Sequence, residues 1–374
     1  MANPPGEISL ELLFRMFDLD AEPDEYGVQV LIHLARRASV RLPNLVLSLA
    51  DGAGLRLGSG SADELARTRA RRADYAELLT EVAELPVRVL KGTALARYYP
   101  EDVLRPVGDI DVTVPDERTL WDVARRVLAK RPAEFVLYSQ FGVAEQHTVI
   151  SIQWPSADPL FDGHDAFEVS TAALLGELER GVAPRTELPS CPWTADLLAV
   201  AEERQQRPFT PKDAVDVVAL ASAELPDMGA VATTVAECRR SPEVVELLEY
   251  TGQWVTLGLL AELLERLRED AVADSTHRSS IATSVHAADT CTIEGRRAVG
   301  LPIYGMPLRE VAGRAHWREA RRHRFAGGEL ALTPVGDYLM VPSKAVDTDL
   351  HAAAVRELAV LDDEQDVISA AATR

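Results

Sequence analysis

The chain has 374 residues, enough for two or three domains that each bury a hydrophobic core. Its composition, 47% hydrophobic and 26% charged, is that of a folded globular protein and excludes wholesale disorder. The formal net charge of -20 argues against a broad basic surface, so nucleic acid is a weak partner prediction, although a local basic strip would still permit it.

Cysteine usage and hydropathy bear on the compartment. The three cysteines, Cys191, Cys238 and Cys291, are widely spaced and form no CxxC pair, so they predict neither a disulfide framework nor a zinc site. The N-terminal residues lack the pattern of a signal peptide, and no apolar run approaches the roughly 20 residues of a membrane span. We therefore expect a cytoplasmic protein with no membrane partner.

The first half of the chain predicts helices followed by an α/β segment. Residues 8–48 carry apolar positions at helical spacing and predict two or three helices, and Ser61 with Glu64 forms a capping-box pattern that opens a helix over 62–83. The run "PVRVLKG" predicts a short strand, "TALARYY" a helical turn and the alternating "DIDVTVP" a second strand. A helix over 117–130 and strands at "EFVLYS" and "HTVISIQW" follow.

The second half is mostly helical by its periodicity. Helices are predicted over 171–180, 193–206, 211–224, 228–239 and 242–269, with a break near "YTGQW". Beyond residue 270 come a polar patch "ADSTHRSS", a basic stretch at 316–324 interpreted as a solvated helix face, short strands and a helical tail. We expect a helical region over 1–64, an α/β core over 65–170, a helical domain over 171–270 and a C-terminal extension over 271–374.

Two acidic residues on the second predicted strand are candidates for metal binding. Alternate side chains of a strand share a face, so Asp109 and Asp111 point the same way, about 7 Å apart along the backbone. Magnesium prefers oxygen ligands and often takes the remainder from water and substrate phosphates. The alternative is an edge strand with one solvated face.

The turn before this strand is a candidate for phosphate binding. Gly92 and Thr93 lie where a strand passes into a helix, and free backbone N–H groups at such a junction attract phosphate oxygens. Glycine allows close approach of the backbone, and the threonine hydroxyl adds a hydrogen bond.

These motifs together resemble the nucleotidyltransferase superfamily typified by DNA polymerase beta, and more closely a bacterial family of uncharacterised nucleotidyltransferases. The resemblance rests on "LKGTALARYYP", Arg105 and "DIDVTV" in that order. It implies an α+β fold with a small mixed sheet flanked by helices, a helical domain and a C-terminal extension. It also implies an NTP substrate, one or two Mg²⁺ ions on the catalytic residues Asp109 and Asp111, and nucleotide binding by Lys91, Gly92, Thr93 and Arg105.

A second stretch of the resemblance lies at 192–220, where a Lys/Arg-Asp-x-x-Asp pattern is met by Lys212, Asp213 and Asp216. In related nucleotidyltransferases a lysine here reaches the nucleotide phosphates, which suits a compact ammonium charge. The alternative interpretation is a helix start, with Thr210 as the cap, Pro211 in the first position and Asp213 in the first turn. Both can hold at once.

The resemblance fails at the third carboxylate, which the family places in an Asp-apolar-His-Trp motif. This chain has Ser151, Ile152, Gln153 and Trp154 there, and neither Ser151 nor Gln153 is a strong base or an anionic ligand. A second acid could substitute, the acceptor could already be ionised, or the site could be degenerate. Residues considered for the acceptor side or for the substituting acid are Ser151, Gln153 and Glu145, followed by Asp162, Asp165 and Glu168.

Three functional hypotheses follow. The first is a Mg²⁺-dependent nucleotidyltransferase that moves a nucleoside monophosphate from an NTP to a small-molecule, peptide or protein acceptor. The second is a catalytically degenerate binding protein of the same fold, acting as a partner in a biosynthetic or defence system. The third treats residues 170–374 as a helical interaction module with the α/β part as its scaffold.

Overall fold

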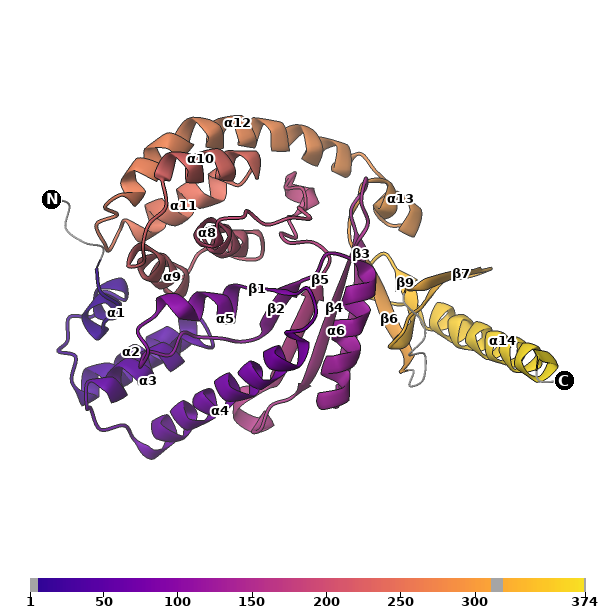
Figure 1. Cartoon of the computed structure of the whole chain (residues 1–374), viewed down its shortest axis with the longest axis horizontal. Helices are drawn as coiled ribbons and strands as arrows, with labels where there is room; N and C mark the ends of the chain where they lie inside the picture. Colours follow the sequence, from indigo (N-terminus) through magenta and orange to yellow (C-terminus); the bar gives the residue numbers. More distant parts are fainter. Residues whose placement is uncertain (1–5, 311–318, 373–374) are drawn as a thin grey trace. The chain divides into compact units, whose positions relative to one another are not determined.

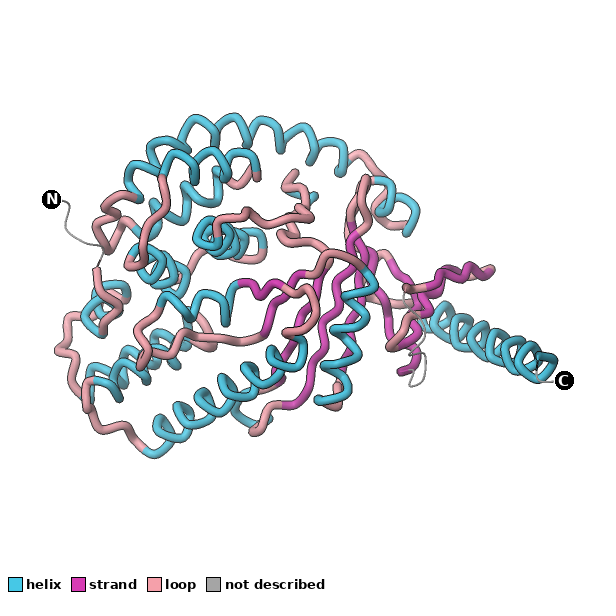
Figure 2. The backbone as a smooth tube through the Cα atoms, in the orientation of Figure 1, coloured by secondary structure: helices cyan, strands magenta, loops and turns pink. Residues whose placement is uncertain are grey.

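The computed structural model describes residues 6–310 and 319–372. The chain divides into two compact units, which are described separately. The first comprises Met1–Ala83, Val87–Thr113 and Ala173–Ala282, and the second comprises Glu84–Pro86, Val114–Ala172 and Thr283–Arg374. Strands and helices combine in an α+β arrangement, which confirms the predicted fold class (Figures 1 and 2).

The first unit begins with the predicted N-terminal helices, α1 (Leu10–Met16), α2 (Glu25–Ala38) and α3 (Leu42–Gly52). Ser9 and Asp24 cap the first two by accepting hydrogen bonds from backbone N–H groups. The long α4 (Ser59–Val82) follows, with Gly58 rather than Ser61 at its N-cap. The helix was predicted correctly, but its predicted capping box was wrong because the helix begins three residues earlier.

A short hairpin-like pair stands next in the first unit. β1 (Arg88–Leu90) runs into α5 (Lys91–Leu95) and the 3-10 turn Ala96–Tyr98, and β2 (Ile110–Thr113) returns antiparallel to β1. Leu90 pairs with Asp111 in the register. The predicted order of strand, turn, helix, loop and strand is confirmed.

Five helices complete the first unit around one apolar cluster (Figure 1). They are α8 (Pro192–Glu202), α9 (Pro211–Ala221), α10 (Met228–Glu237), α11 (Ser241–Thr251) and the start of α12 (Leu260–His286). The break between α11 and α12 confirms the one predicted at "YTGQW". The "ADSTHRSS" patch was expected outside helices but is part of α12, where its polar residues are tolerated because most are exposed.

The predicted helix over 171–180 was wrong. This segment is an irregular loop with isolated bridges between Leu174 and Arg185 and between Glu177 and Val182. Gly176 has a φ of 65°, and a Cβ there would lie 2.4 Å from the Val182 carbonyl oxygen. The left-handed backbone and this close approach explain why a helical periodicity does not become a helix here.

The second unit is built on an antiparallel run of strands in the order β5-β4-β3-β6-β9-β8-β7. Its strands are β3 (Phe135–Phe141), β4 (His147–Pro155), β5 (His164–Ser170), β6 (Ile303–Glu310), β7 (Arg321–Phe325), β8 (Gly328–Leu332) and β9 (Gly336–Val341). Its helices are α6 (Glu117–Lys130), α7 (Pro159–Asp162), α13 (Ile293–Ala298) and α14 (Thr348–Ala372).

Different helices pack against the two faces of these strands. α6 packs against β4 and β5, where Ile150, Ile152 and Phe167 are fully buried. On the other side α14 contributes Ala354 and Leu358 to an apolar cluster with β8 and β9. β4 alternates between these faces, so Ile150 and Ile152 are buried while Val149, Ser151 and Gln153 are half-buried.

Two strands of this unit escaped prediction. β5 occupies the segment "FDGHDAFE", whose acidic residues suggested a loop, and β7 occupies the basic stretch that was interpreted as a helix face. Residues 316–318 of that stretch lie outside the described residues. Both strands form through pairing with distant neighbours, which local periodicity does not reveal.

Candidate functional site

The acidic pair lies at the start of β2 in the first unit. Asp109 directly precedes the strand and is exposed, whereas Asp111 lies within it and is half-buried. Ile110, Val112 and Val114 point to the opposite face and are at most 3% exposed. The predicted alternation is therefore confirmed, and it leaves both carboxylates on one face.

The turn from β1 into α5 packs against the backbone of the acidic segment. A Cβ at Gly92 would lie 3.1 Å from Val107 Cγ1 and 3.2 Å from the Asp109 carbonyl oxygen. Lys91, just before it, has a φ of 47°, which is uncommon for a residue with a side chain. Glycine at position 92 is thus explained by close packing, and phosphate binding by this residue stays a prediction.

Arg105 is the centre of a buried polar network. Its Nε and Nη2 donate to the two carboxylate oxygens of Asp216 at 2.7 and 2.8 Å, and its Nη1 donates to the Gly92 carbonyl oxygen at 2.9 Å. The Tyr99 hydroxyl donates to Asp216 at 2.6 Å. Arg105 therefore links α9 to the Gly92 turn, which makes it a positioning residue, and its contact with a nucleotide remains a prediction.

Electrostatics in this network keep Asp216 ionised. Burial alone would raise the pKa of its carboxyl, but the charges of Arg105 and Lys212 outweigh burial and lower it. Burial and the neighbouring Asp216 charge raise the pKa of Tyr99 well above its usual value, so the phenol remains a hydrogen-bond donor.

Lys91 and Lys212 belong to a cationic cluster that continues from this network. Lys91 Nζ lies 3.0 Å from Glu203, and Lys212 Nζ lies 3.7 Å from Asp216. Arg207 contacts Glu203 at 3.0 Å and Asp213 at 2.7 Å. The cluster, defined here as Lys91, Arg105, Glu203, Arg207, Lys212, Asp213 and Asp216, holds four cations and three carboxylates and therefore has a positive formal charge.

Burial adjusts two members of the cationic cluster in opposite ways. Burial and the charge of Arg105 lower the pKa of Lys212 below that of a free lysine. Burial acts to raise the pKa of Glu203, but Lys91 and Lys212 together lower it. Glu203 stays ionised and holds the Lys91 ammonium in place.

The start of α9 confirms the structural interpretation of the Lys212 segment. Thr210 and Asp213 form a reciprocal capping box, and Pro211 occupies the first turn. The Asp213 carboxylate accepts from the Thr210 backbone N–H at 2.7 Å. Asp213 is thus a cap, and Lys212 is placed by the same turn that the capping box stabilises.

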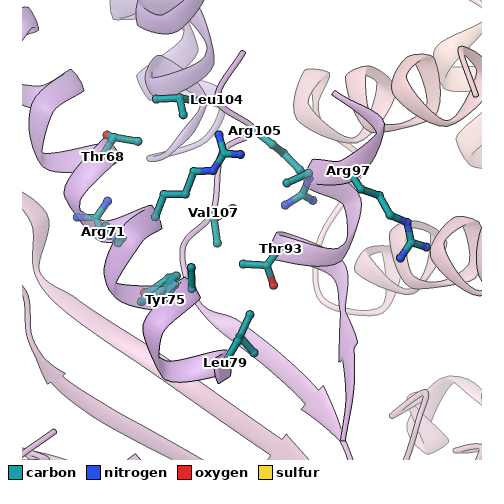
Figure 3. A pocket seen from close by; sticks show the side chains of 12 residues that line it. Thr68, Arg71, Tyr75, Leu79, Thr93, Arg97, Leu104, Arg105 and Val107 are labelled. Atoms are coloured by element: carbon teal, nitrogen blue, oxygen red, sulfur yellow. The ribbon is translucent and has the colours of Figure 1, made fainter. Parts of the chain in front are cut away.

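Thr93 faces a cavity that Lys91 does not line, although Arg105 of the cationic cluster lines it too. The cavity has a volume of about 280 Å³ and is also lined by residues of α4, as Figure 3 shows. Thr93 Oγ1 is buried and has no hydrogen-bond partner among the described residues. The structure thus separates two neighbours in the sequence, since Lys91 contacts Glu203 whereas Thr93 faces this cavity.

The residues predicted for the acceptor side belong to the second unit. Ser151 and Gln153 lie on the half-buried face of β4, and Gln153 Nε2 donates to Ser151 Oγ at 3.3 Å. Glu168 on β5 stands directly opposite Ser151 in the register. Glu145 lies in the exposed turn before β4. Of the acids considered as substitutes, Glu168 is therefore the one whose strand position pairs with Ser151.

Ser151 and Glu168 also line a cavity of about 350 Å³ within the second unit. Its walls come from β3, β6 and β9 and are largely apolar, and Lys344 lies at its rim, 5.5 Å from the Tyr304 ring centroid. Glu203, Tyr99 and this cavity were not anticipated from the sequence. The available signal for Tyr99 was its place in the "LKGTALARYYP" motif, although its contact with Asp216 was not predicted. The available signal for the cavity was the polar Ser139, Ser151 and Glu168 at alternate strand positions.

The metal-binding prediction can be tested against the donor chemistry. Over residues 6–310 and 319–372, no group of three or more His, Cys, Asp or Glu side chains gathers as a metal site would require. Two carboxylates on one strand face supply only hard oxygen donors. These donors fit Mg²⁺ that arrives with phosphate ligands, rather than a permanently bound metal.

Comparison with known proteins locates the chain in a family. No curated protein and no solved structure gives a significant match. In the part of the chain that the structure describes, no helix combines the length and hydropathy that crossing a membrane requires. The model of a family described as uncharacterised nucleotidyltransferase matches residues 56–256, which is more than half of the chain and includes the acidic pair, the Gly92 turn and the cationic cluster. The chain belongs to this nucleotidyltransferase family.

Proposed function

We propose that the protein is a Mg²⁺-dependent nucleotidyltransferase of the DNA polymerase beta-like type, which transfers a nucleoside monophosphate from an NTP to a small-molecule, peptide or protein acceptor. The observation that carries the proposal is the acidic pair on one face of β2, with the Gly92 turn packed against the Asp109 backbone. Family membership supports nucleotidyl transfer in general. The metal, the acceptor and the residue roles are our proposals.

The first unit would bind the nucleotide. Asp109 and Asp111 would hold Mg²⁺, which when bound neutralises charge on the phosphates. The cationic cluster has an excess positive charge, so its Lys91 and Lys212 ammonium groups are the candidates for phosphate binding. Glu203 and Asp216 would orient these ammonium groups rather than contact the substrate.

The chemical step is a displacement at the α-phosphorus. The acceptor oxygen or nitrogen forms a bond to the α-phosphorus while the bond to the bridging oxygen of the β-phosphate breaks, and pyrophosphate leaves with that oxygen. Positioning and charge stabilisation supply most of the rate in such transfers. The residues named above bind and orient, and none forms a covalent intermediate.

For the acceptor side we propose Ser151 and Glu168, which line one cavity within the second unit. Glu168 would replace the carboxylate that the resemblance expects at position 151, because it stands opposite Ser151 on the neighbouring strand. It would accept the proton that an acceptor hydroxyl or amine loses. The Ser151 hydroxyl would then bind the acceptor rather than act as a base.

A second candidate function has its own observation. Ser151 has no charge, its hydroxyl accepts a hydrogen bond from Gln153, and the described residues contain no cluster of three metal-ligating side chains. A protein of this kind could bind an NTP without transferring it. It would then act through the nucleotide-bound state as a partner of another protein.

Pyrophosphate release separates the two candidates. The native protein, Glu168→Gln and Asp109→Asn/Asp111→Asn are incubated with Mg²⁺ and each NTP over a panel of hydroxyl, amine and phosphate acceptors. The nucleotidyltransferase proposal expects release by the native protein, a loss of at least a hundredfold in the aspartate variant and a similar loss in Glu168→Gln with hydroxyl acceptors. Nucleotide binding with no release over the whole panel would favour the second candidate.

A further inference from the structure

The basic strand β7 has no part in the proposed nucleotide and acceptor sites. It contributes no residue to the cavity of Ser151 and Glu168, and it lies beyond the end of the family match at residue 256. Its five residues include three arginines and a histidine, in a chain whose formal net charge is -20. Positive charge concentrated in this way on an acidic protein is a candidate surface for an acidic partner.

β7 is a terminal strand of the second unit. It ends the strand order and pairs antiparallel with β8, from Arg321 opposite Leu332 to Phe325 opposite Gly328 (Figure 1). In the part of the chain that the structure describes, β8 is its only strand partner. A terminal strand directs alternate backbone N–H and C=O groups outward, where another extended chain can pair with them. β7 therefore offers a backbone edge for strand addition.

The two faces of β7 have different surroundings. His323 Nε2 lies 2.7 Å from Glu357 of α14, and Phe325 packs against the apolar cluster that α14 shares with β8 and β9. Arg322 and Arg324 alternate with these residues and therefore point to the opposite face. Successive residues on one face of a strand are about 7 Å apart, so the two arginines form a short row along the edge of the sheet.

Three arginines share one carboxylate on the face of Arg322 and Arg324. Arg297 Nη2 donates to Glu329 at 2.7 Å, and the Nε atoms of Arg322 and Arg324 lie 3.8 and 3.5 Å from the same carboxylate. Among the described residues these three arginines form no other ion pair. Three cations and one carboxylate leave an excess of positive charge, which attracts further carboxylates.

Arg324 is the most accessible of the three arginines. Its side chain is 73% exposed, compared with 35% for Arg322 and 23% for Arg297. Its separation from Glu329, 3.5 Å, is longer than a charge-assisted hydrogen bond. Arg322 is held beside it, because its Nη2 donates to Gln140 Oε1 at 2.9 Å. Arg324 can therefore bind a carboxylate from outside while Arg322 stays fixed at the edge.

We propose that β7 binds an extended acidic peptide by strand addition, with carboxylates at alternate positions of the peptide beside Arg322 and Arg324. Backbone pairing would supply affinity, and the two arginines would supply the preference for acidic sequences. The same charges oppose pairing with a second copy of β7, because like charges would face each other. Nucleic acid lacks the N–H and C=O pattern that pairs with a strand. The proposal does not rest on nucleotidyl transfer.

Fluorescence anisotropy with a labelled peptide of sequence GTEVETG tests the proposal, because its two glutamates lie at alternate positions. At low salt we expect the native protein to bind this peptide about tenfold more tightly than GTKVKTG, in which both charges are reversed. GPEPEPG keeps both glutamates, but proline removes the alternate N–H groups, so this peptide should also bind more weakly.

A charge reversal at Arg324 tests the assigned surface. Arg324→Glu should weaken binding of GTEVETG about tenfold, because an attraction becomes a repulsion. Arg266→Glu is the matched control, because Arg266 is half exposed on α12 of the first unit and pairs with Glu262 of its own helix. It makes the same change in net charge and should leave binding unchanged. Both variants replace exposed side chains and should keep the native melting temperature.

Hydrogen exchange distinguishes strand addition from a purely electrostatic contact. Saturating GTEVETG should slow the exchange of backbone amides within Arg321–Phe325 about fivefold or more and leave those of α12 unchanged. Absence of binding to the native protein, equal binding by the native protein and Arg324→Glu, or binding without slower exchange in β7 would overturn the proposal. Tighter binding of a short single-stranded DNA that is lost in Arg324→Glu would also overturn it, by assigning this surface to nucleic acid.

Discussion

Arg105 is a residue of the sequence motif whose contacts in the structure are with other parts of the fold. Its side chain is only 2% exposed, and its guanidinium N–H groups donate to the Asp216 carboxylate and to the Gly92 carbonyl oxygen. A buried ion pair of this kind gains little net stability over an apolar pair, but the loss of one partner leaves an uncompensated charge. The pair therefore fixes the position of the Gly92 turn relative to α9.

Removal of Arg105 should be strongly destabilising. Arg105→Leu leaves the buried Asp216 without its hydrogen-bonded cation and with only Lys212 at 3.7 Å, and we expect the free energy of unfolding to fall by about 3–5 kcal/mol, measured by urea denaturation. Arg56→Ala is the control, because the Arg56–Glu25 pair is fully exposed and its loss should not be measurable. Equal midpoints for native and Arg105→Leu would contradict this role.

The same pair predicts a pH dependence. Burial alone would raise the pKa of Asp216, but the charge of Arg105 lowers it by a larger amount. The pKa of Asp216 in the folded protein is therefore below its ordinary value. The ionised form then stabilises the fold above the unfolded pKa of about 3.9, and this stability is lost as the pH falls below that value. In Arg105→Leu the buried carboxyl prefers its proton, so the stability difference between native and variant should narrow from pH 7 to pH 3. A difference that stays constant would contradict the assignment.

Replacement of Thr93 should raise the free energy of unfolding, whereas replacement of Arg105 should lower it. Because Thr93 Oγ1 is buried without a partner, Thr93→Val removes an unsatisfied polar group at nearly constant volume. We expect the ligand-free protein to gain about 1 kcal/mol in free energy of unfolding. A loss of stability would mean that the hydroxyl makes a hydrogen bond in the free protein.

At the scale of elements, local pattern predicted most of the first half of the chain. α6 has the predicted bounds, and β2 has the predicted alternation of buried and polar residues. β5 was missed because its acidic residues suggest a loop until β4 pairs with it. The opposition of Ser151 and Glu168 could not be predicted for the same reason, since register depends on contacts between distant strands.

In the candidate site, too, the features set by local sequence could be predicted, and those that depend on contacts between distant residues could not. The acidic pair and the Gly92 turn were evident from short motifs, whereas the partnership of Arg105 with Asp216 joins residues separated by 111 positions. The contrast between Lys91 and Thr93 also required the structure, because one residue contacts Glu203 and the other faces a cavity on α4. Sequence spacing alone assigns both to the same ligand.

The start of α9 provides a prediction for an element. Thr210 and Asp213 satisfy backbone N–H groups at the N-terminus reciprocally, so Thr210→Ala should cost about 1 kcal/mol of unfolding free energy. Thr233→Ala is the control, because the exposed Thr233 hydroxyl donates only to a carbonyl of its own helix. Equal losses in urea denaturation of the two variants would contradict a specific capping contribution.

At the scale of the whole molecule, the acidic net charge is compatible with membership of a nucleotidyltransferase family because basic side chains are concentrated in one place. The chain has a formal net charge of -20, yet the cationic cluster gathers four basic side chains within the first unit, which also holds Asp109 and Asp111. The family match ends at residue 256, so β6–β9 and α14 lie beyond it. These C-terminal elements supply part of the proposed acceptor cavity and are where acceptor specificity is expected to reside.

The central claim is that Asp109 and Asp111 bind an NTP through Mg²⁺. The direct measurement is a calorimetric titration of ATP, GTP, CTP and UTP, each with and without Mg²⁺, into the native protein and into Asp109→Ala/Asp111→Ala. The control, Glu101→Ala/Asp102→Ala, removes two exposed carboxylates from the loop before β2. We predict that at least one NTP binds the native and control proteins more tightly with Mg²⁺ and that the aspartate variant loses this dependence. Absence of NTP binding, or equal Mg²⁺-dependent binding by all three proteins, would contradict the account.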